Sequence, residues 1–376
     1  MKPAPLTGLK IVELARILAG PWAGQVFADL GAEVVKVESP DGDDTRSWGP
    51  PFVENADGSR DAAYFHATNR GKRAVVIDFR TPEGQAEVKA LIADADVVIE
   101  NFKVGALARY GLDYASLAAR NPALIYCSIT GFGQDGPYAH RAGYDFIVQG
   151  MSGIMDLTGD PAGAPQKIGV AFVDIFTGLY AVIAIQAALA MRERTGRGQQ
   201  IDMALLDVMT GVLANQAMNY LVSGVAPTRL GNAHPNIAPY AAYPTADGWL
   251  ILAVGNDSQF RRFCAVVGLS DMPDDPRFAT NPARVAHRDA LTTRVTQAMA
   301  RFPRDALLAR LEAEGVPAGP INTVAEAFAD PQVIARGMAL AIARDDGTTV
   351  PGVRTPIRFS DADLVLNQPA PPLPRR

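Results

Sequence analysis

Short apolar, β-branched runs alternate with helix-type segments through the first 130 residues of this chain. Strands are expected at residues 9–14, 33–38, 74–79, 96–99 and 124–129. Between them, Gly20-Pro21 opens a helix that closes at Leu30-Gly31, and Thr81 caps a second helix that runs through residue 93. Alternation of this kind requires crossovers between parallel strands, so it predicts an α/β fold whose parallel sheet is covered on both faces.

The chain has 376 residues, which is too long for one small core, so two domains are expected. Residues 224–244 are rich in Pro, Gly and Asn and resemble a connection between domains. A second unit follows it, with a strand, several helices and two final strand-like stretches. We expect these elements at residues 249–254, 258–267, 284–302, 304–314, 339–343 and 350–358, with further helices up to residue 336.

Charge and cysteine usage restrict the partners. The net charge is −5 and the pI is near 5.5, which argues against nucleic acid because phosphate binding needs a broad basic surface. The four histidines show no metal-ligand spacing, so no metal is expected. Cys127 and Cys264 lie far apart in apolar runs and are expected to be buried free thiols, which suits a cytoplasmic location.

The apolar run at residues 170–191 is about long enough to span a membrane. It contains Asp174, Thr177, Tyr180 and Gln186 and stands alone, and no signal segment opens the chain. We therefore expect a buried helix and no membrane partner.

Asp174 is the only formal charge between Lys167 and Arg192. One reading is a helix N-cap, since Asp at that position accepts orphan backbone N–H groups at the positive end of the helix dipole. The other reading is catalytic. A cap environment would keep the carboxylate ionised, and an ionised carboxylate in an apolar pocket is a competent nucleophile toward an activated acyl group. Both readings can hold together.

Residues 131–136 (GFGQDG) match the spacing of dinucleotide-binding loops, but Pro137 follows at once and no helical period comes after it. A tight backbone loop is the better interpretation. Signatures of serine hydrolases and P-loop enzymes are absent from the sequence.

Basic residues follow two of the expected strands, at the edge where open parallel sheets bind ligands. Arg80 follows one strand, Lys103 follows another, and Arg109 comes shortly after. Such residues usually hydrate the surface, but together they could hold a nucleotide phosphate. Residues 231–240 form either a rigid linker or a loop that covers a site.

With these segments in hand, the chain resembles the family III CoA-transferases, which include formyl-CoA:oxalate CoA-transferase, the carnitine CoA-transferases and the 2-methylacyl-CoA racemases. The resemblance covers nearly the whole chain and is carried by ordered blocks: PLTGLKIVEL, LAGPWAGQVFADLGAEVVKVESP, NRGKRAVVIDF, VVIENF, YGLDY, IYCSITGFGQDGPY, RAGYD, VDIFTGLYA, RTGRGQQIDMALLD, GNAHPNIAPY and EGVPAGPIN.

The resemblance implies a Rossmann-like large CoA-binding domain at residues 1–224 and a small α+β domain with its linkers at 225–325. A C-terminal segment, 326–376, would return to the large domain. It also implies that two such chains interlock as a ring-like homodimer.

In the family, an aspartate at the position of Asp174 attacks an acyl-CoA thioester, giving a mixed anhydride and then an aspartyl-CoA thioester from which a carboxylic acid takes the CoA. The resemblance thus implies coenzyme A as the acyl-CoA substrate. Carried over by position, the CoA contacts would be Leu18, Ala19, Arg80, Asn101, Phe102, Lys103, Arg109, Tyr144 and Asp145.

Departures from the family pattern indicate which branch the chain resembles. Leu18 stands where formyl-CoA transferases have Gln, and Tyr144 stands where the racemases have a catalytic His; Tyr is a poor base near neutrality. Residues 42–52 look most like the dicarboxylate branch, so succinyl-CoA and another dicarboxylate are the expected substrates. An oxalate-type transferase, a racemase and a non-catalytic CoA-binding protein are the alternatives.

Overall fold

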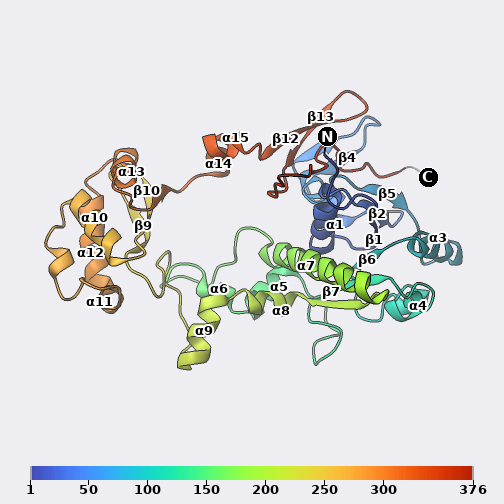
Figure 1. The fold of residues 1–376 in the computed structure, drawn as a ribbon, viewed down its shortest axis with the longest axis horizontal. Helices are drawn as coiled ribbons and strands as arrows, with labels where there is room; N and C mark the ends of the chain where they lie inside the picture. The colour runs from blue at the N-terminus through green and yellow to red at the C-terminus, as the bar shows by residue number, and fades with distance from the viewer. Residues whose placement is uncertain (1, 375–376) are drawn as a thin grey trace. The chain divides into compact units, whose positions relative to one another are not determined.

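A computed structural model of the chain describes residues 2–374. The chain divides into two compact units, each described by itself below (Figure 1). The first unit contains residues up to 154, 167–225 and those from 331 onward, and the second contains 155–166 and 226–330. The domain boundaries expected after residues 224 and 325 stay a prediction. The short segment 155–166, which no sequence pattern marked, groups with the second unit.

A six-stranded sheet forms the centre of the first unit, and every pair of neighbouring strands is parallel. Its spatial order is β5 (Arg73–Val76), β2 (Glu33–Glu38), β1 (Lys10–Glu13), β6 (Val97–Glu100), β7 (Ile125–Thr130) and β8 (Gln200–Ala204). The order along the chain therefore reverses between β1 and β6, as in dinucleotide-binding folds. The predicted parallel sheet is confirmed, and β8 is an edge strand that the sequence analysis did not identify.

Helices cover both faces of this sheet, because each face carries its own apolar core. On one face α1 (Ala19–Asp29) packs against α7 (Phe172–Thr195), together with α5 (Asp145–Met151) and α8 (Leu205–Gly211). On the other face α3 (Pro82–Ala93) and α4 (Tyr114–Ala118) supply apolar side chains to the second core. Thr81 caps α3 as predicted, accepting a hydrogen bond from the Gly84 N–H.

The contact between α1 and α7 is close. A Cβ atom on Gly178 would lie 2.7 Å from the Ala19 carbonyl oxygen, so only glycine fits at that position. This contact fixes the first turn of α1 beside the first two turns of α7. The two segments are thereby held together although more than 150 residues separate them.

Helix α7 differs from the expected buried helix. Val173, Thr177, Ala181 and Ile185 are buried, but Ile183 on the other side is 62% exposed. Within the described residues, α7 is the single helix that is long and apolar enough to cross a membrane, and a lone helix of this kind is weak evidence for a span.

The first unit is completed by small elements around the sheet. They are η1 (Asp44–Ser47), the antiparallel pair β3 (Phe52–Glu54) and β4 (Arg60–Ala62), α2 (Ala63–His66), η2 (Ala108–Tyr110), α9 (Ala214–Ser223), α15 (Pro331–Ala335) and the antiparallel pair β12 (Ala339–Ala343) and β13 (Thr349–Val353). Helix α6 (Ile154–Leu157) spans the boundary between the two units.

The second unit has a three-stranded antiparallel sheet in the order β11 (Ala318–Pro320), β10 (Trp249–Ala253) and β9 (Tyr240–Pro244). Its core also takes side chains from α10 (Asp257–Val267), η3 (Met272–Asp274), α11 (Asn281–Ala286), α12 (Arg288–Met299) and α13 (Arg304–Ala313). The unit also contains α14 (Val324–Ala329), which has no buried residue.

Two expectations for this unit are corrected. The expected linker ends in a strand, β9, because Tyr243 enters the core. The single helix expected at 284–302 is two helices, because His287 leaves the helical backbone conformation at ψ 35°.

Candidate active site

A cavity of about 580 Å³ opens within the first unit, at the carboxyl ends of the strands where the strand order reverses. Open α/β sheets bind their ligands at this place, because the loops after two adjacent strands diverge there. The walls come from the segments after β1, β6 and β7, from residues 139–145 and from the start of α7. Eight predicted site residues line it: Leu18, Ala19, Asn101, Phe102, Lys103, Tyr144, Asp145 and Asp174.

Asp174 is the third residue of α7 and lies in its first turn, with Ala171 at the cap position. The N-cap reading of Asp174 is therefore wrong, because Ala171 is the N-cap residue and Asp174 lies inside the helix. Burial raises the pKa of Asp174 to about 7, and the negative charge of Asp145 adds to the shift. The expectation that a cap environment keeps this carboxylate ionised is therefore wrong, since burial favours its protonated form.

Asp145 supplies the bond at the start of α7 that Asp174 was expected to make. Its Oδ1 accepts the Val173 N–H at 2.9 Å, and its Oδ2 accepts from Gln149 Nε2 at 2.8 Å. Gln149 is fully buried and accepts the Ile168 N–H at 2.9 Å. These bonds fix the chain on both sides of residues 169–172 and so position Asp174 against the cavity.

The loop after β1 is held in an unusual conformation. Asn101, just beyond β6, accepts the Arg16 N–H at 3.0 Å and donates to the Arg16 carbonyl oxygen at 2.7 Å. Ile17 has φ +73°, a left-handed backbone that is costly for a β-branched residue. Its N–H donates to the two Asp43 carboxylate oxygens at 3.4 and 3.3 Å. Asn101, predicted as a CoA contact, thus also orders the loop that precedes Leu18 and Ala19.

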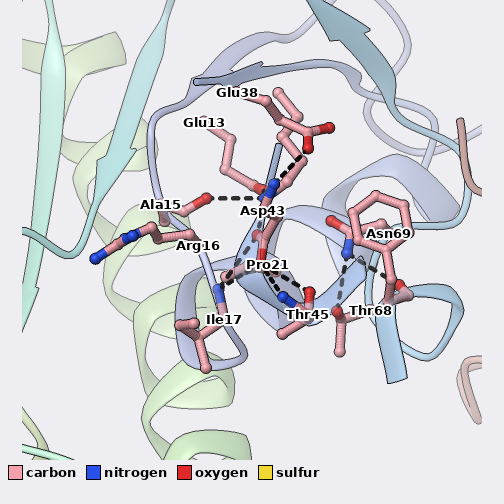
Figure 2. A network of polar contacts seen from close by, with 12 residues as sticks. Glu13, Ala15, Arg16, Ile17, Pro21, Glu38, Asp43, Thr45, Thr68 and Asn69 are labelled. Atoms are coloured by element: carbon pink, nitrogen blue, oxygen red, sulfur yellow. Dashed lines mark hydrogen bonds and ion pairs between the residues drawn. The ribbon is translucent and has the colours of Figure 1, made fainter. Parts of the chain in front are cut away.

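Beside this loop is a cluster of buried ions, of which Figure 2 labels Glu13 and Asp43. Glu13 Oε1 accepts hydrogen bonds from Lys36 at 3.1 Å and from Lys72 at 3.0 Å, and Lys36 also forms an ion pair with Asp43 at 2.9 Å. These four side chains are at most 1% exposed. Burial opposes the charge of Asp43, but Lys36 and hydrogen bonds from Thr45 outweigh it, so the pKa of Asp43 is lowered. We call Glu13, Lys36, Asp43 and Lys72 the buried ion cluster.

Three cations line the cavity, and the sequence analysis identified only Lys103 among them. Arg16 pairs with Asp44 at 2.9 Å. The Arg141 guanidinium lies over the Tyr138 ring at 4.6 Å. Arg16 could have been identified from the sequence, since it stands just after the strand expected at 9–14. Arg141 could not, because it lies in a loop, and residue spacing does not predict the path of a loop.

Arg80 and Arg109 do not line the cavity. Arg80 pairs with Asp78 at 2.8 Å, and Arg109 lies over the Tyr110 ring at 4.6 Å. Both arginines neighbour an aromatic cluster that reaches the cavity wall. The ring of Phe79, next to Arg80, has its centroid 5.7 Å from that of Phe102 in the wall and 5.5 Å from that of Tyr110, next to Arg109. Their role as CoA contacts stays a prediction.

The loop after β7 is the tight turn that was predicted for residues 131–136. Gly133 and Gly136 have φ +90° and +81°. Gly131 and Gly143 approach so closely that a Cβ on Gly131 would lie 2.5 Å from the Gly143 Cα atom. This approach brings Tyr144 and Asp145 to the end of β7.

Both cysteines are free and buried, as predicted. Among residues 2–374, no group of three or more His, Cys, Asp or Glu side chains is arranged to hold a metal ion.

Comparison with known proteins places this site in a family. The model of CoA-transferase family III matches residues 6–375. The chain is 62% identical to the succinate–glutarate CoA-transferase of Agrobacterium fabrum, over 98% of this chain and 93% of that protein. It is 41% identical to the succinyl-CoA:glutarate CoA-transferase of Mus musculus, over 98% and 83% of the two chains. A crystal structure of a CAIB/BAIF family protein from Brucella suis superposes with a TM-score of 0.88 at 65% identity, covering 99% and 97%.

The chain therefore belongs to CoA-transferase family III. It is an enzyme of the CoA-transferase type, and CoA is a substrate of this class of enzyme.

Proposed function

We propose that the enzyme transfers CoA between succinyl-CoA and a second dicarboxylate of the glutarate type, with Asp174 as the nucleophile. The observation that carries this proposal is the placement of Asp174 in one cavity with the loops after β1 and β6. The names of the relatives from Agrobacterium fabrum and Mus musculus support the choice of substrates.

The reaction starts when the Asp174 carboxylate attacks the thioester carbonyl. A C–O bond forms and the C–S bond breaks, which leaves a mixed anhydride and CoA thiolate. The thiolate then attacks the Asp174 carbonyl, so that succinate departs and an aspartyl-CoA thioester remains. The acceptor carboxylate attacks that carbonyl and releases the thiolate, which finally attacks the acceptor carbonyl and frees Asp174.

The start of α1 can stabilise the negative charge that develops on the thioester carbonyl oxygen. Leu18 and Ala19 line the cavity, and Leu18, the N-cap residue of α1, makes no side-chain cap hydrogen bond. The first N–H groups of a helix have no partner within it and face its positive end. In this proposal they stabilise the oxyanion of each tetrahedral step.

The raised pKa of Asp174 suits this role. A buried carboxylate is a stronger base and nucleophile than a solvated one, and the part of the population that is ionised reacts. Lys103 and Arg141 supply positive charge for the CoA phosphates.

The proposal is tested by incubating the enzyme with succinyl-CoA and glutarate and identifying the CoA products by mass spectrometry. Wild type should form glutaryl-CoA and succinate. The Asp174→Asn variant, which keeps the side-chain shape, should form neither above background. A folded Asp174→Asn protein with normal turnover would refute the role of Asp174.

We also propose that the enzyme is a homodimer. Helix α9 carries a group of exposed apolar side chains that a partner would cover, namely Met218, Tyr220, Leu221 and Val222. Light scattering on the purified protein tests this, and a monomer at micromolar concentration would contradict it. The buried free cysteines suit a cytoplasmic location, which cell fractionation would test.

A further inference from the structure

We infer that Arg16 binds the second carboxylate of the substrate, the one that does not react, and so makes the enzyme selective for dicarboxylates. This inference rests on the proposed function, because it assumes that a dicarboxylate occupies the cavity beside Asp174. Arg16 and Asp174 line the same cavity. Figure 2 shows the Arg16 side chain extending away from the buried ion cluster.

The backbone of Arg16 is held more firmly than a surface arginine needs. Asn101 bonds both its N–H and its carbonyl oxygen, and the next residue, Ile17, takes a left-handed conformation that Asp43 secures. Such a conformation is unfavourable for Ile and persists only where the surroundings fix it. The unfavourable backbone conformation of Ile17 lowers the stability of the fold, but it sets the direction of the chain at Arg16.

The guanidinium itself remains available. The Arg16 side chain is 57% exposed, and one guanidinium nitrogen pairs with Asp44, whose side chain is 49% exposed. Arginine carries five N–H donors in a planar fork that matches a carboxylate. The remaining donors can bind a substrate carboxylate while Asp44 keeps the fork oriented.

The other two cavity cations are placed less well for this task. Lys103 follows β6, and Arg141 lies on the loop after β7 with its guanidinium over an aromatic ring. Arg16 stands three residues before Ala19, at the start of α1. The Ala19 carbonyl group packs on Gly178, which lies one helical turn after Asp174 in α7. The tight α1–α7 contact fixes the Arg16 segment next to the nucleophile. The bond between Asp145 and Val173 also fixes the segment that carries Arg141, but the Arg141 guanidinium lies over the Tyr138 ring. In this inference a diacid has one carboxyl carbon at Asp174 and its other carboxylate at Arg16, because both residues line the one cavity.

The test compares glutarate with glutaramate, which has the same shape but carries a neutral amide in place of one carboxylate. Wild type should prefer glutarate by about a hundredfold in kcat/KM, because the neutral amide cannot make the charge-assisted contact that the carboxylate makes with the Arg16 fork. In Arg16→Gln this preference should fall to within about threefold, while Arg16→Lys should keep an intermediate preference. The exposed Arg120→Gln serves as the matched arginine control and should keep the wild-type ratio.

A ratio of two acceptors is a readout that a general loss of structure does not move. Equal loss of activity toward both acceptors in Arg16→Gln, or an unchanged preference, would overturn the inference and leave the proposed function standing. Wild type that forms glutaryl-CoA but prefers neither acceptor would also overturn it. Wild type that forms no dicarboxylyl-CoA would instead refute the proposed function, and the inference with it.

Discussion

Two groups of charges adjoin the loop after β1, the buried ion cluster and the charges of the cavity, and they differ in how they are paired. In the buried ion cluster, Glu13 and Asp43 meet Lys36 and Lys72 within 3.1 Å, and water is excluded. In the cavity, Arg16 and Lys103 are exposed and Asp174 has no cation among the causes of its pKa shift. The first group is paired within itself and fixes the backbone, whereas in the proposed reaction substrate pairs with the second.

The largest expected effect comes from removing the nucleophile in the cavity. Asp174→Asn should lower kcat for CoA transfer by at least about 10⁴-fold, since no covalent intermediate can form. Steady-state assays with succinyl-CoA measure the loss. Asp44→Asn, which changes a carboxylate in the same cavity, is the matched control and should lose far less. Equal losses in the two variants would contradict a special role for Asp174.

Breaking the buried ion cluster should cost stability. Lys36→Met leaves Glu13 and Asp43 without their shared cation, and loss of one partner from a buried pair costs about 3–5 kcal/mol of unfolding free energy. Denaturant titration measures this change. Lys103→Met, which removes an exposed cavity lysine, should change stability by less than about 0.5 kcal/mol. If both variants lost the same stability, the contrast between the two groups would be wrong.

The pH dependence of the reaction should follow Asp174. The nucleophile is its ionised form, so kcat/KM should rise about tenfold per pH unit below pH 7 and level off above it. A pH–rate profile with a donor that does not titrate in this range measures the rise. A kcat/KM profile that is already flat from pH 5 upward would show that the pKa of Asp174 is not near 7.

Binding of CoA should respond to the cavity cations and not to the cluster. Lys103→Met should raise KM for succinyl-CoA by about tenfold, because one charge-assisted contact to phosphate is lost. The effect should weaken at high salt. Calorimetric titration with CoA tests it, and unchanged affinity at low salt would remove Lys103 from the site.

The last expected effect is on the stability of the Asp174→Asn variant. Folding raises the pKa of Asp174 from its ordinary 3.8 to about 7, so the ionised form costs the folded state more than the unfolded one. That cost is absent below about pH 4, grows as the pH rises toward 7 and is constant above. The variant should therefore melt a few degrees above wild type at pH 8 and close to it at pH 4. A variant that melts lower at pH 8 would contradict this sign.

The sequence predicted the central sheet well, because strands such as β2 and the capped helix α3 carry local signals that tertiary packing does not override. It missed β8, an edge strand whose pairing with β7 is set by distant contacts. It also placed Asp174 at the cap of α7, since an Asp before an apolar run looks the same whether it is the cap or the third residue.

Most predicted site residues do meet in one cavity, because the ends of adjacent parallel strands share an edge. Two features of the site depend on the paths of loops, which residue spacing does not predict. One is the hydrogen bond that Asp145 accepts at the start of α7, 28 residues along the chain, and the other is the presence of Arg16 and Arg141 in the same cavity wall. The raised pKa of Asp174 likewise depends on burial, which only the packed structure reveals.

Trapping the covalent intermediate tests the central claim most directly. The enzyme is incubated with succinyl-CoA and hydroxylamine, which attacks the aspartyl-CoA thioester at its carbonyl and expels CoA, and its peptides are then analysed by mass spectrometry. A hydroxamate on Asp174, dependent on succinyl-CoA, is the predicted result. A hydroxamate on Asp145 or another carboxylate, with Asp174 unmodified during turnover, would contradict the account.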